Sequence, residues 1–146
     1  MSSLGHLSRR FVRSLSRREP HAADTAWALR QLLPAEADLW LRMMAQDRRH
    51  SLLVARRFVE RAPDASREEV AAALLHDIGK VGCGMGTLAR VVATIVGPRG
   101  RRFRRYHDHE RIGAELLSAA GSAANTIELV RGRGPRASVL GDADDI

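Results

Sequence analysis

Cysteine, aromatic residues and long apolar runs are all scarce in this chain of 146 residues. The one cysteine, Cys83, cannot form a disulfide within the chain, so nothing calls for an oxidising compartment. Aromatic residues make up 4% of the sequence, too few to suggest platforms on which single-stranded bases stack. No apolar run approaches the roughly 20 residues of a transmembrane helix, and no secretory apolar block follows the basic start. We therefore expect a cytoplasmic protein without a transmembrane segment.

Lysine is nearly absent as well, because Lys80 is the only one in a chain of net charge +7. A charge made almost wholly of arginine is typical of a GC-rich bacterial genome, so we expect no specific nucleic-acid partner. Residues 1–20 nevertheless form a basic leader that holds five arginines and ends at Pro20. A poorly ordered tail and a surface helix that contacts an anionic surface are both compatible with the leader.

The remainder of the chain has a helical pattern. Its apolar residues are mostly alanine and leucine, they recur at helical spacing, and no alternating strand pattern competes. Asp24 is expected to cap the first helix. Ser66 and Glu69 have the spacing of a capping box that opens a later helix, and Gly79 is expected to close that helix. The sequence therefore predicts an all-α domain over residues 21–146, a single bundle of about six or seven helices.

An acidic residue stands where this later helix should present a core residue. At 100° per residue, Val70 and Leu74 share one helical face with Asp77. A carboxylate that faces inward at a helix end is costly unless it is paired or coordinates a cation. His76 flanks the same face and would add a neutral nitrogen. The pair thus offers two ligands to a divalent metal ion.

Further ligand-type residues lie on other predicted helices. They are His50, His109 and a group of aspartates near the C-terminus, Asp142, Asp144 and Asp145. His50 faces inward because it shares a stripe with Leu53 and Val54. Taken singly, an inward histidine is more often a hydrogen-bonded core residue, and terminal aspartates are usually solvated. Together these residues fit the way helical bundles build metal sites in their cores. The spacing alone leaves metal binding and core packing equally open.

The string Leu74-Leu75-His76-Asp77-Ile78-Gly79-Lys80 resembles the motif of the HD superfamily of metal-dependent phosphohydrolases. The pattern of that superfamily is a histidine, then a His-Asp pair, then a distant aspartate, and the match runs from about Asp47 to Ile146. The family's Ala-Asp pattern favours Asp144 over Asp142 and Asp145 as the last member. The resemblance implies a single divalent metal ion with four ligands, His50, His76, Asp77 and Asp144. The segment before Asp47 also resembles a short actinobacterial subgroup.

The same resemblance implies an activity. Members of the superfamily are usually all-helical and hydrolyse phosphomonoesters or phosphodiesters, often of nucleotides. By this resemblance, metal-activated water attacks a small phosphorylated substrate, and Asp77 holds the ion and orients the water. Lys80 would meet a phosphate as a point charge, although a solvent-exposed lysine at a helix end is the alternative. His109 matches a histidine that serves a second metal or contacts the phosphate in some relatives.

Two departures from the superfamily pattern narrow this expectation. Two-metal relatives carry an adjacent pair of histidines downstream, whereas residues 128–135 contain no histidine, so we expect one metal ion. The Gly-Tyr-Pro signature of cyclic-di-GMP phosphodiesterases is also missing. The alternative function is a catalytically weak HD-fold module that binds metal and nucleotide for regulation. The sequence leaves the oligomeric state open, a homodimer included.

Overall fold

The computed structural model describes residues 18–80 and 107–145, with the backbone alone at residues 80 and 107–109. Over these ranges the chain forms seven α-helices, one 3₁₀ turn and no strand, so the expected all-α class is confirmed. The elements are α2 (Ala22–Gln31), α3 (Pro34–Arg42), α4 (Ala45–Arg61), α5 (Arg67–Leu75), the 3₁₀ turn η1 (Ile78–Lys80), α7 (His107–Ala119), α8 (Ala124–Val130) and α9 (Ala137–Asp144). None of these helices is long and apolar enough to cross a membrane. Cys83 and residues 1–17 of the leader lie outside the described ranges.

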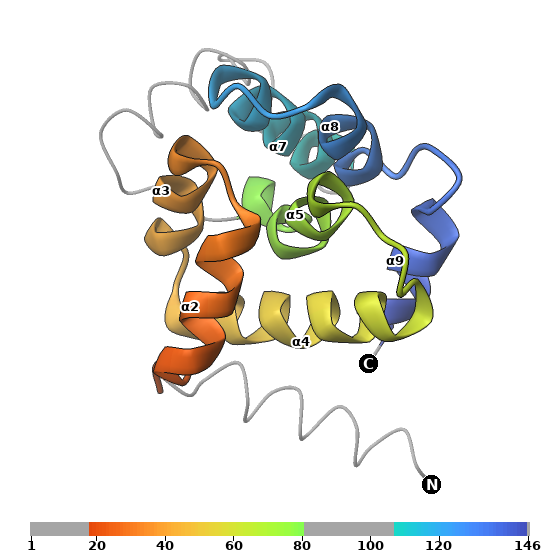
Figure 1. Ribbon diagram of the computed structural model, residues 1–146. Coiled ribbons are helices and arrows are strands. Elements are labelled where there is room, and N and C mark those ends of the chain that lie inside the picture. Colours follow the sequence, from red (N-terminus) through yellow and green to blue (C-terminus); the bar gives the residue numbers. More distant parts are fainter. Residues whose placement is uncertain (1–17, 81–106, 146) are drawn as a thin grey trace, which may run out of the picture.

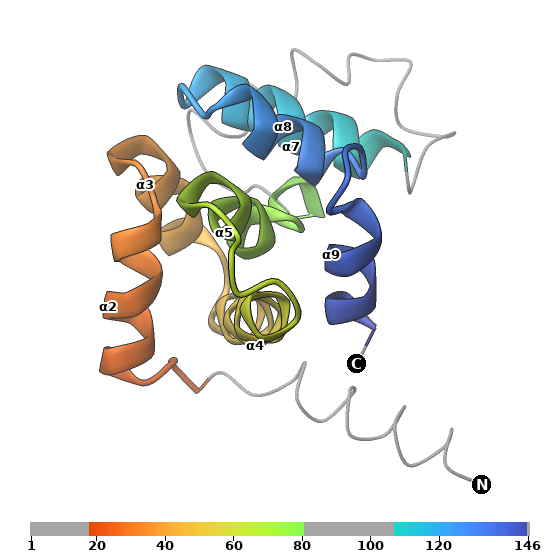
Figure 2. The same ribbon diagram turned by 45° about the vertical axis from the view of Figure 1, so that its right-hand side comes forward.

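Helix α5 lies at the centre of the bundle (Figures 1 and 2) and contacts α2, α3, α4 and α8. All of its residues from Val70 to Leu75 are buried. A helix that is apolar on every side is stable only when other elements surround it. Its three consecutive alanines, at 71–73, have small side chains, which suits close packing of the neighbouring helices. Helix α9 packs along α4, while α7 packs against η1 and α8.

Large apolar side chains fill the space around α5. The largest of those that are fully buried are Trp40, Phe58, Leu74, Leu75, Ile78 and Leu117. Burying an apolar side chain of this size stabilises a fold by about 1.5–3 kcal/mol. The indole Nε1 of Trp40 donates to Ser51 Oγ over 2.9 Å, so the polar group of that ring is satisfied inside the core.

A buried carboxylate ties three helical ends together. Glu36 is 1% exposed, and its oxygens accept from the backbone N–H of Leu33 over 2.8 Å and from Ser122 Oγ over 2.6 Å. The guanidinium of Arg67 lies 4.0 Å away. These partners come from the start of α3, the loop before α8 and the start of α5. The hydrogen bonds offset the cost of burying the charge.

The predicted ends of the helices were partly right. The capping box of α5 is confirmed, since Glu69 N donates to Ser66 Oγ over 3.2 Å and Ser66 N donates to Glu69 Oε1 over 3.0 Å. Asp24 as a cap was wrong, because α2 begins after His21 and Asp24 lies in its first turn. A carboxylate there still favours the helix dipole. Gly79 as the end of α5 was also wrong, because the α-helix ends at Leu75.

The early end of α5 has a local cause. His76 Nδ1 donates to the carbonyl of Ala73 over 2.7 Å. In a continuing α-helix that carbonyl would accept from the N–H of residue 77. The chain instead makes a turn at His76 and Asp77 and continues into η1. Gly113 of α7 lets this turn pack closely, since a Cβ there would lie 3.3 Å from Ile78 Cγ2.

Candidate metal centre

His76 and Asp77 lie in the turn that follows α5, beside His50 of α4 and the C-terminal end of α9. The side chain of His76 is 9% exposed and that of Asp77 is 21% exposed. Because His76 Nδ1 donates to Ala73, its other nitrogen, Nε2, points the opposite way, towards the carboxylates. Nε2 lies 3.4 Å from Asp77 Oδ2 and 3.2 Å from Asp144 Oδ1. A backbone hydrogen bond that fixes one ring nitrogen and frees the other is the usual support of a metal-ligating histidine.

His50 reaches the same place from α4. Its Nε2 lies 2.9 Å from Asp144 Oδ1 and 4.0 Å from Asp77 Oδ2. The stripe that predicted its inward direction was half wrong, because Val54 is buried but Leu53 is 40% exposed. His50 lies on the flank of α4, at the border between the core and the surface, and its side chain is 35% exposed. That flank faces the cluster because α9 packs against it.

Asp144 is the last residue of α9, and it is the one of the three terminal aspartates that lies beside the histidines. Asp142 and Asp145 are both exposed. The helical rotation explains the difference, since residues one or two positions apart on a helix point in clearly different directions. The family pattern therefore selected the aspartate that the fold brings to His76.

Sequence reasoning missed two arginines that hold α9 in place. Arg57 of α4 donates from Nε to the carbonyl of Ala143 over 3.0 Å, directly before Asp144. At the other end of the helix, Arg136 lies 2.8 Å from Asp64 and 3.3 Å from Glu69. The chain is rich in arginine throughout, so no local signal separated these two from the solvated ones. Together they hold both ends of α9, and Arg57 contacts the end that presents Asp144.

The ligand-type atoms of His50, His76, Asp77 and Asp144 all lie within 4.8 Å of one another. Zinc and similar divalent ions take imidazole nitrogens and carboxylate oxygens at roughly 2.0–2.2 Å. Two ligands of one ion are then at most about 4.4 Å apart, so small shifts suffice to close this group on an ion. Two histidines and two carboxylates are also a donor set that such ions accept. The group therefore fits a single divalent cation.

The charges in the cluster also favour a cation at this position. Burial alone lowers the pKa of His76, but hydrogen bonds to Asp144 and Asp77 outweigh it and raise that pKa to about 10. Hydrogen bonds from His50 and His76 hold the pKa of Asp144 well below its usual range. The carboxylates thus attract positive charge to the point where the two ring nitrogens meet. A proton on His76 can supply that charge, and so can a metal ion.

Two predicted catalytic residues have side chains outside the described part of the structure. Lys80 is the last residue of η1, and His109 lies in the first turn of α7. The backbones of these two elements pack against each other. Their roles remain predictions. Asp77, the third predicted catalytic residue, lies in the cluster.

The comparisons with known proteins agree with this geometry. The family model described as the HD domain matches residues 48–143, which is more than half of the chain. The matched region includes His50, His76 and Asp77 and ends one residue before Asp144. No match was found among curated proteins or among solved structures. From the extent of the family match, together with the all-α fold, the chain belongs to the HD-domain family.

Proposed function

We propose that this protein is a metal-dependent phosphohydrolase that acts on a small phosphorylated molecule, a nucleotide by first choice. One observation carries the proposal: four ligand-type side chains from α4, the α5 turn and α9 converge within 4.8 Å. Membership of the HD-domain family supports hydrolysis of phosphate esters as the reaction class. A divalent ion held by this group would polarise a phosphoryl oxygen and lower the pKa of a water molecule.

The four residues of the cluster differ in burial and in their contacts, and we assign each a role on that basis. His76 is the most buried of the four and is oriented by its bond to Ala73, so it is the fixed point of the group. Asp77 is partly exposed and lies beside His76 Nε2, where its carboxylate can accept a hydrogen bond from water. Asp144 bridges the two histidines. Lys80, three residues after Asp77, would add positive charge for the phosphate.

The test is metal analysis of the purified protein followed by a phosphatase screen. The screen uses nucleoside monophosphates and phosphodiesters with Mn²⁺, Co²⁺ or Mg²⁺. We expect one divalent ion per chain and turnover that falls by roughly a hundredfold or more in the His76→Ala, Asp77→Ala double variant. Asp142→Asn is the matched control, because Asp142 is an exposed aspartate of α9 outside the cluster. Turnover that survives the double variant would rule the proposal out.

A regulatory module that binds metal and nucleotide without useful turnover is the second candidate. Within residues 18–80 and 107–145, the cluster is the one group of histidines and acids with the spacing for a metal ion. Residues 128–135 contain no histidine with which to build a second centre, as two-metal relatives do. Thermal stabilisation by a nucleotide without hydrolysis, across the same panel, would favour this candidate over the first.

We further propose that the segment before Asp47 is related to a short actinobacterial subgroup and that the protein is cytoplasmic. We also propose that it forms a homodimer and that residues 1–20 contact an anionic surface. Sedimentation of the full chain and of a chain lacking residues 1–20 tests the last two together. If residues 1–20 bind acidic membranes, deleting them should abolish that binding, and the binding of the full chain should weaken as the salt concentration rises.

A further inference from the structure

Helix α3 lies at the edge of the bundle and has one exposed side (Figures 1 and 2). Its buried residues, Glu36 and Trp40, are one turn apart and therefore share the inner side of the helix. The exposed residues lie on the opposite side, and we call them the outer face of α3. They are Pro34, Ala35, Asp38, Leu41 and Arg42.

The outer face of α3 and the residues just after it expose apolar area. Leu41 is 46% exposed, and Met44, two residues after the end of α3, is 56% exposed. In the described part of the chain, one other large apolar side chain is exposed, that of Leu53 in α4. Exposed apolar side chains that are scattered singly are ordinary, whereas a group of them marks a site of interaction.

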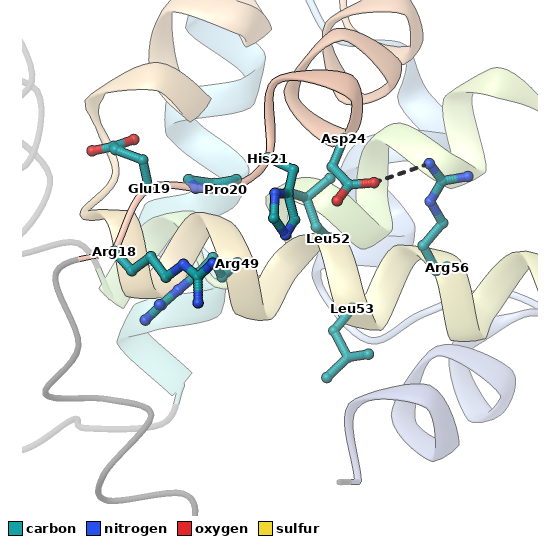
Figure 3. Close-up of a pocket in the computed structure, with 9 residues that line it drawn as sticks. All are labelled: Arg18, Glu19, Pro20, His21, Asp24, Arg49, Leu52, Leu53 and Arg56. Atoms are coloured by element: carbon teal, nitrogen blue, oxygen red, sulfur yellow. Dashed lines mark hydrogen bonds and ion pairs between the residues drawn. The ribbon is translucent and has the colours of Figure 1, made fainter.

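The charges of the outer face have no ion-pair partner within the described residues. Asp38 and Arg42 are four residues apart, and neither takes part in a salt bridge there. The pocket beside α4 and the start of α2 is different (Figure 3), because Asp24 lies 3.4 Å from Arg56 and the other arginines around it are also engaged. The outer face of α3 thus offers one acid and one base to another molecule.

An acid and a base one turn apart make the outer face complementary to itself. When two copies of α3 lie antiparallel about a two-fold axis between these positions, Asp38 faces the partner's Arg42 and Arg42 faces the partner's Asp38. Leu41 then lies close to the axis, where it can pack against its own copy. We propose that two copies of this chain form a homodimer through the outer faces of α3. The inference assigns a surface to the homodimer proposed above and is independent of the proposed hydrolysis.

The charge of the chain favours a second copy at this place over other places and other partners. The net charge is +7, so most contacts between two copies bring like charges together. Helix α4, for example, has five arginines against Asp47 and Glu60. The outer face of α3 has one charge of each sign, so two copies meet there without net repulsion. An anionic membrane or nucleic acid would meet the carboxylate of Asp38 there.

Sedimentation of the full chain between about 1 µM and about 300 µM tests the proposal, because a helix about 13 Å long gives a small interface and a dimer that dissociates at micromolar concentrations. Leu41→Glu should abolish the dimer, since it puts two carboxylates beside the axis. Asp38→Arg and Arg42→Asp should each weaken dimerisation roughly tenfold or more, because symmetry places two pairs of like charges in every dimer. The double variant that carries both changes should dimerise as the unaltered chain does.

A mixture of the two single variants gives the sharpest result. The Asp38→Arg chain has two bases on the outer face and the Arg42→Asp chain has two acids, so the mixture should associate more tightly than either variant alone. A variant that failed to fold could not recover in this way. Asp142→Arg and Arg61→Asp are the matched controls, because they change the net charge equally at exposed positions of α9 and α4. Both should dimerise as the unaltered chain does.

Three results would overturn the assignment. A chain that stays monomeric over the whole range would reject the homodimer as well as the surface. A dimer that survives Leu41→Glu and both single reversals would form elsewhere, so the homodimer would stand and this surface would be rejected. The third result is a pair of controls weakened as much as the single reversals, or a mixture that associates no better than its components. Overall charge, and not the pairing of Asp38 with Arg42, would then control association.

Discussion

The two ends of α5 are built in opposite ways. At the N-terminal end, Ser66 and Glu69 satisfy each other's backbone groups within four consecutive residues. At the C-terminal end, His76 and Asp77 meet His50 and Asp144, and His76 lies 68 residues from Asp144 along the chain. The first end is capped by its own residues, and the charge of Glu69 is also paired with Arg136, 3.3 Å away. The second end gathers carboxylates and ring nitrogens that need a proton or a cation. A helix that is buried for stability thus also presents a polar end for chemistry.

The largest expected effect concerns Asp144, the partner of His76 at the C-terminal end of α5. A divalent ion at 100 times its dissociation constant should stabilise the fold by about 2.7 kcal/mol, which raises Tm by roughly 5–10 °C for a chain of this size. Asp144→Asn should abolish most of that rise, because it replaces the charged carboxylate that both histidines contact with a neutral amide. Thermal unfolding with and without Mn²⁺ measures the rise in Tm for each protein. The exposed neighbour Asp142→Asn should keep the full rise, and equal losses in both variants would contradict the assignment.

A second effect should follow from the contact that positions Asp144. Arg57→Met removes the bond to the carbonyl of Ala143 and leaves the ligand-type side chains intact. Loss of a group that supports a ligand typically weakens metal binding by about 10–100-fold. Calorimetric titration of the variant with Mn²⁺ should show this weakening. Arg61→Met, on the same helix and exposed, should bind as the unaltered chain does. Equal affinities for all three proteins would show that Arg57 has no positioning role.

Competition between a proton and a metal ion at His76 should further distinguish the C-terminal end of α5 from its N-terminal end. The raised pKa of His76, about 10, means that without metal its ring stays protonated at neutral pH. That interaction stabilises the metal-free fold fully below the unfolded pKa of 6.5 and is lost as pH rises through about 10. A metal ion must displace the proton, so apparent affinity should rise by up to about tenfold per pH unit between pH 6 and 8.

Calorimetry in buffers of different ionisation enthalpy measures this displacement. About one proton should be released for each ion bound at pH 7. An affinity that does not change with pH, together with no proton release, would show that His76 is not a ligand.

The smallest effect belongs to the local end of the helix. Ser66→Ala removes the side-chain half of the capping box and should lower the free energy of unfolding by about 1 kcal/mol. Urea unfolding measures it, and Ser66→Asp, which can still cap, should restore most of the loss. Metal affinity should be unchanged in both variants. A metal affinity that falls with the cap would show that the two ends are coupled.

The same contrast explains what the sequence could predict. The capping box and the all-α class depend on residues close together in the chain, and both predictions were confirmed. The periodicity of α5 predicted that Asp77 faces the core, whereas its side chain is 21% exposed, and the same pattern extended the helix to Gly79. It missed the bond from His76 to Ala73 that ends α5 at Leu75.

The partners of the cluster were beyond local reasoning. The stripe that placed His50 contained Leu53, which is exposed, and periodicity did not select one terminal aspartate. Only the family pattern favoured Asp144, and the fold brings that residue to the histidines. The contact of Arg57 with Ala143 depends on how α9 lies along α4, so the residues near Arg57 in the sequence could not predict it.

The most direct test is anomalous X-ray scattering from crystals of the full chain grown with Mn²⁺. The predicted result is one strong peak per chain, about 2.0–2.3 Å from His50 Nε2, His76 Nε2 and carboxylate oxygens of Asp77 and Asp144. A fully occupied ion bound elsewhere, or a cluster without a peak at saturating Mn²⁺, would contradict the assignment of these four residues as the metal centre.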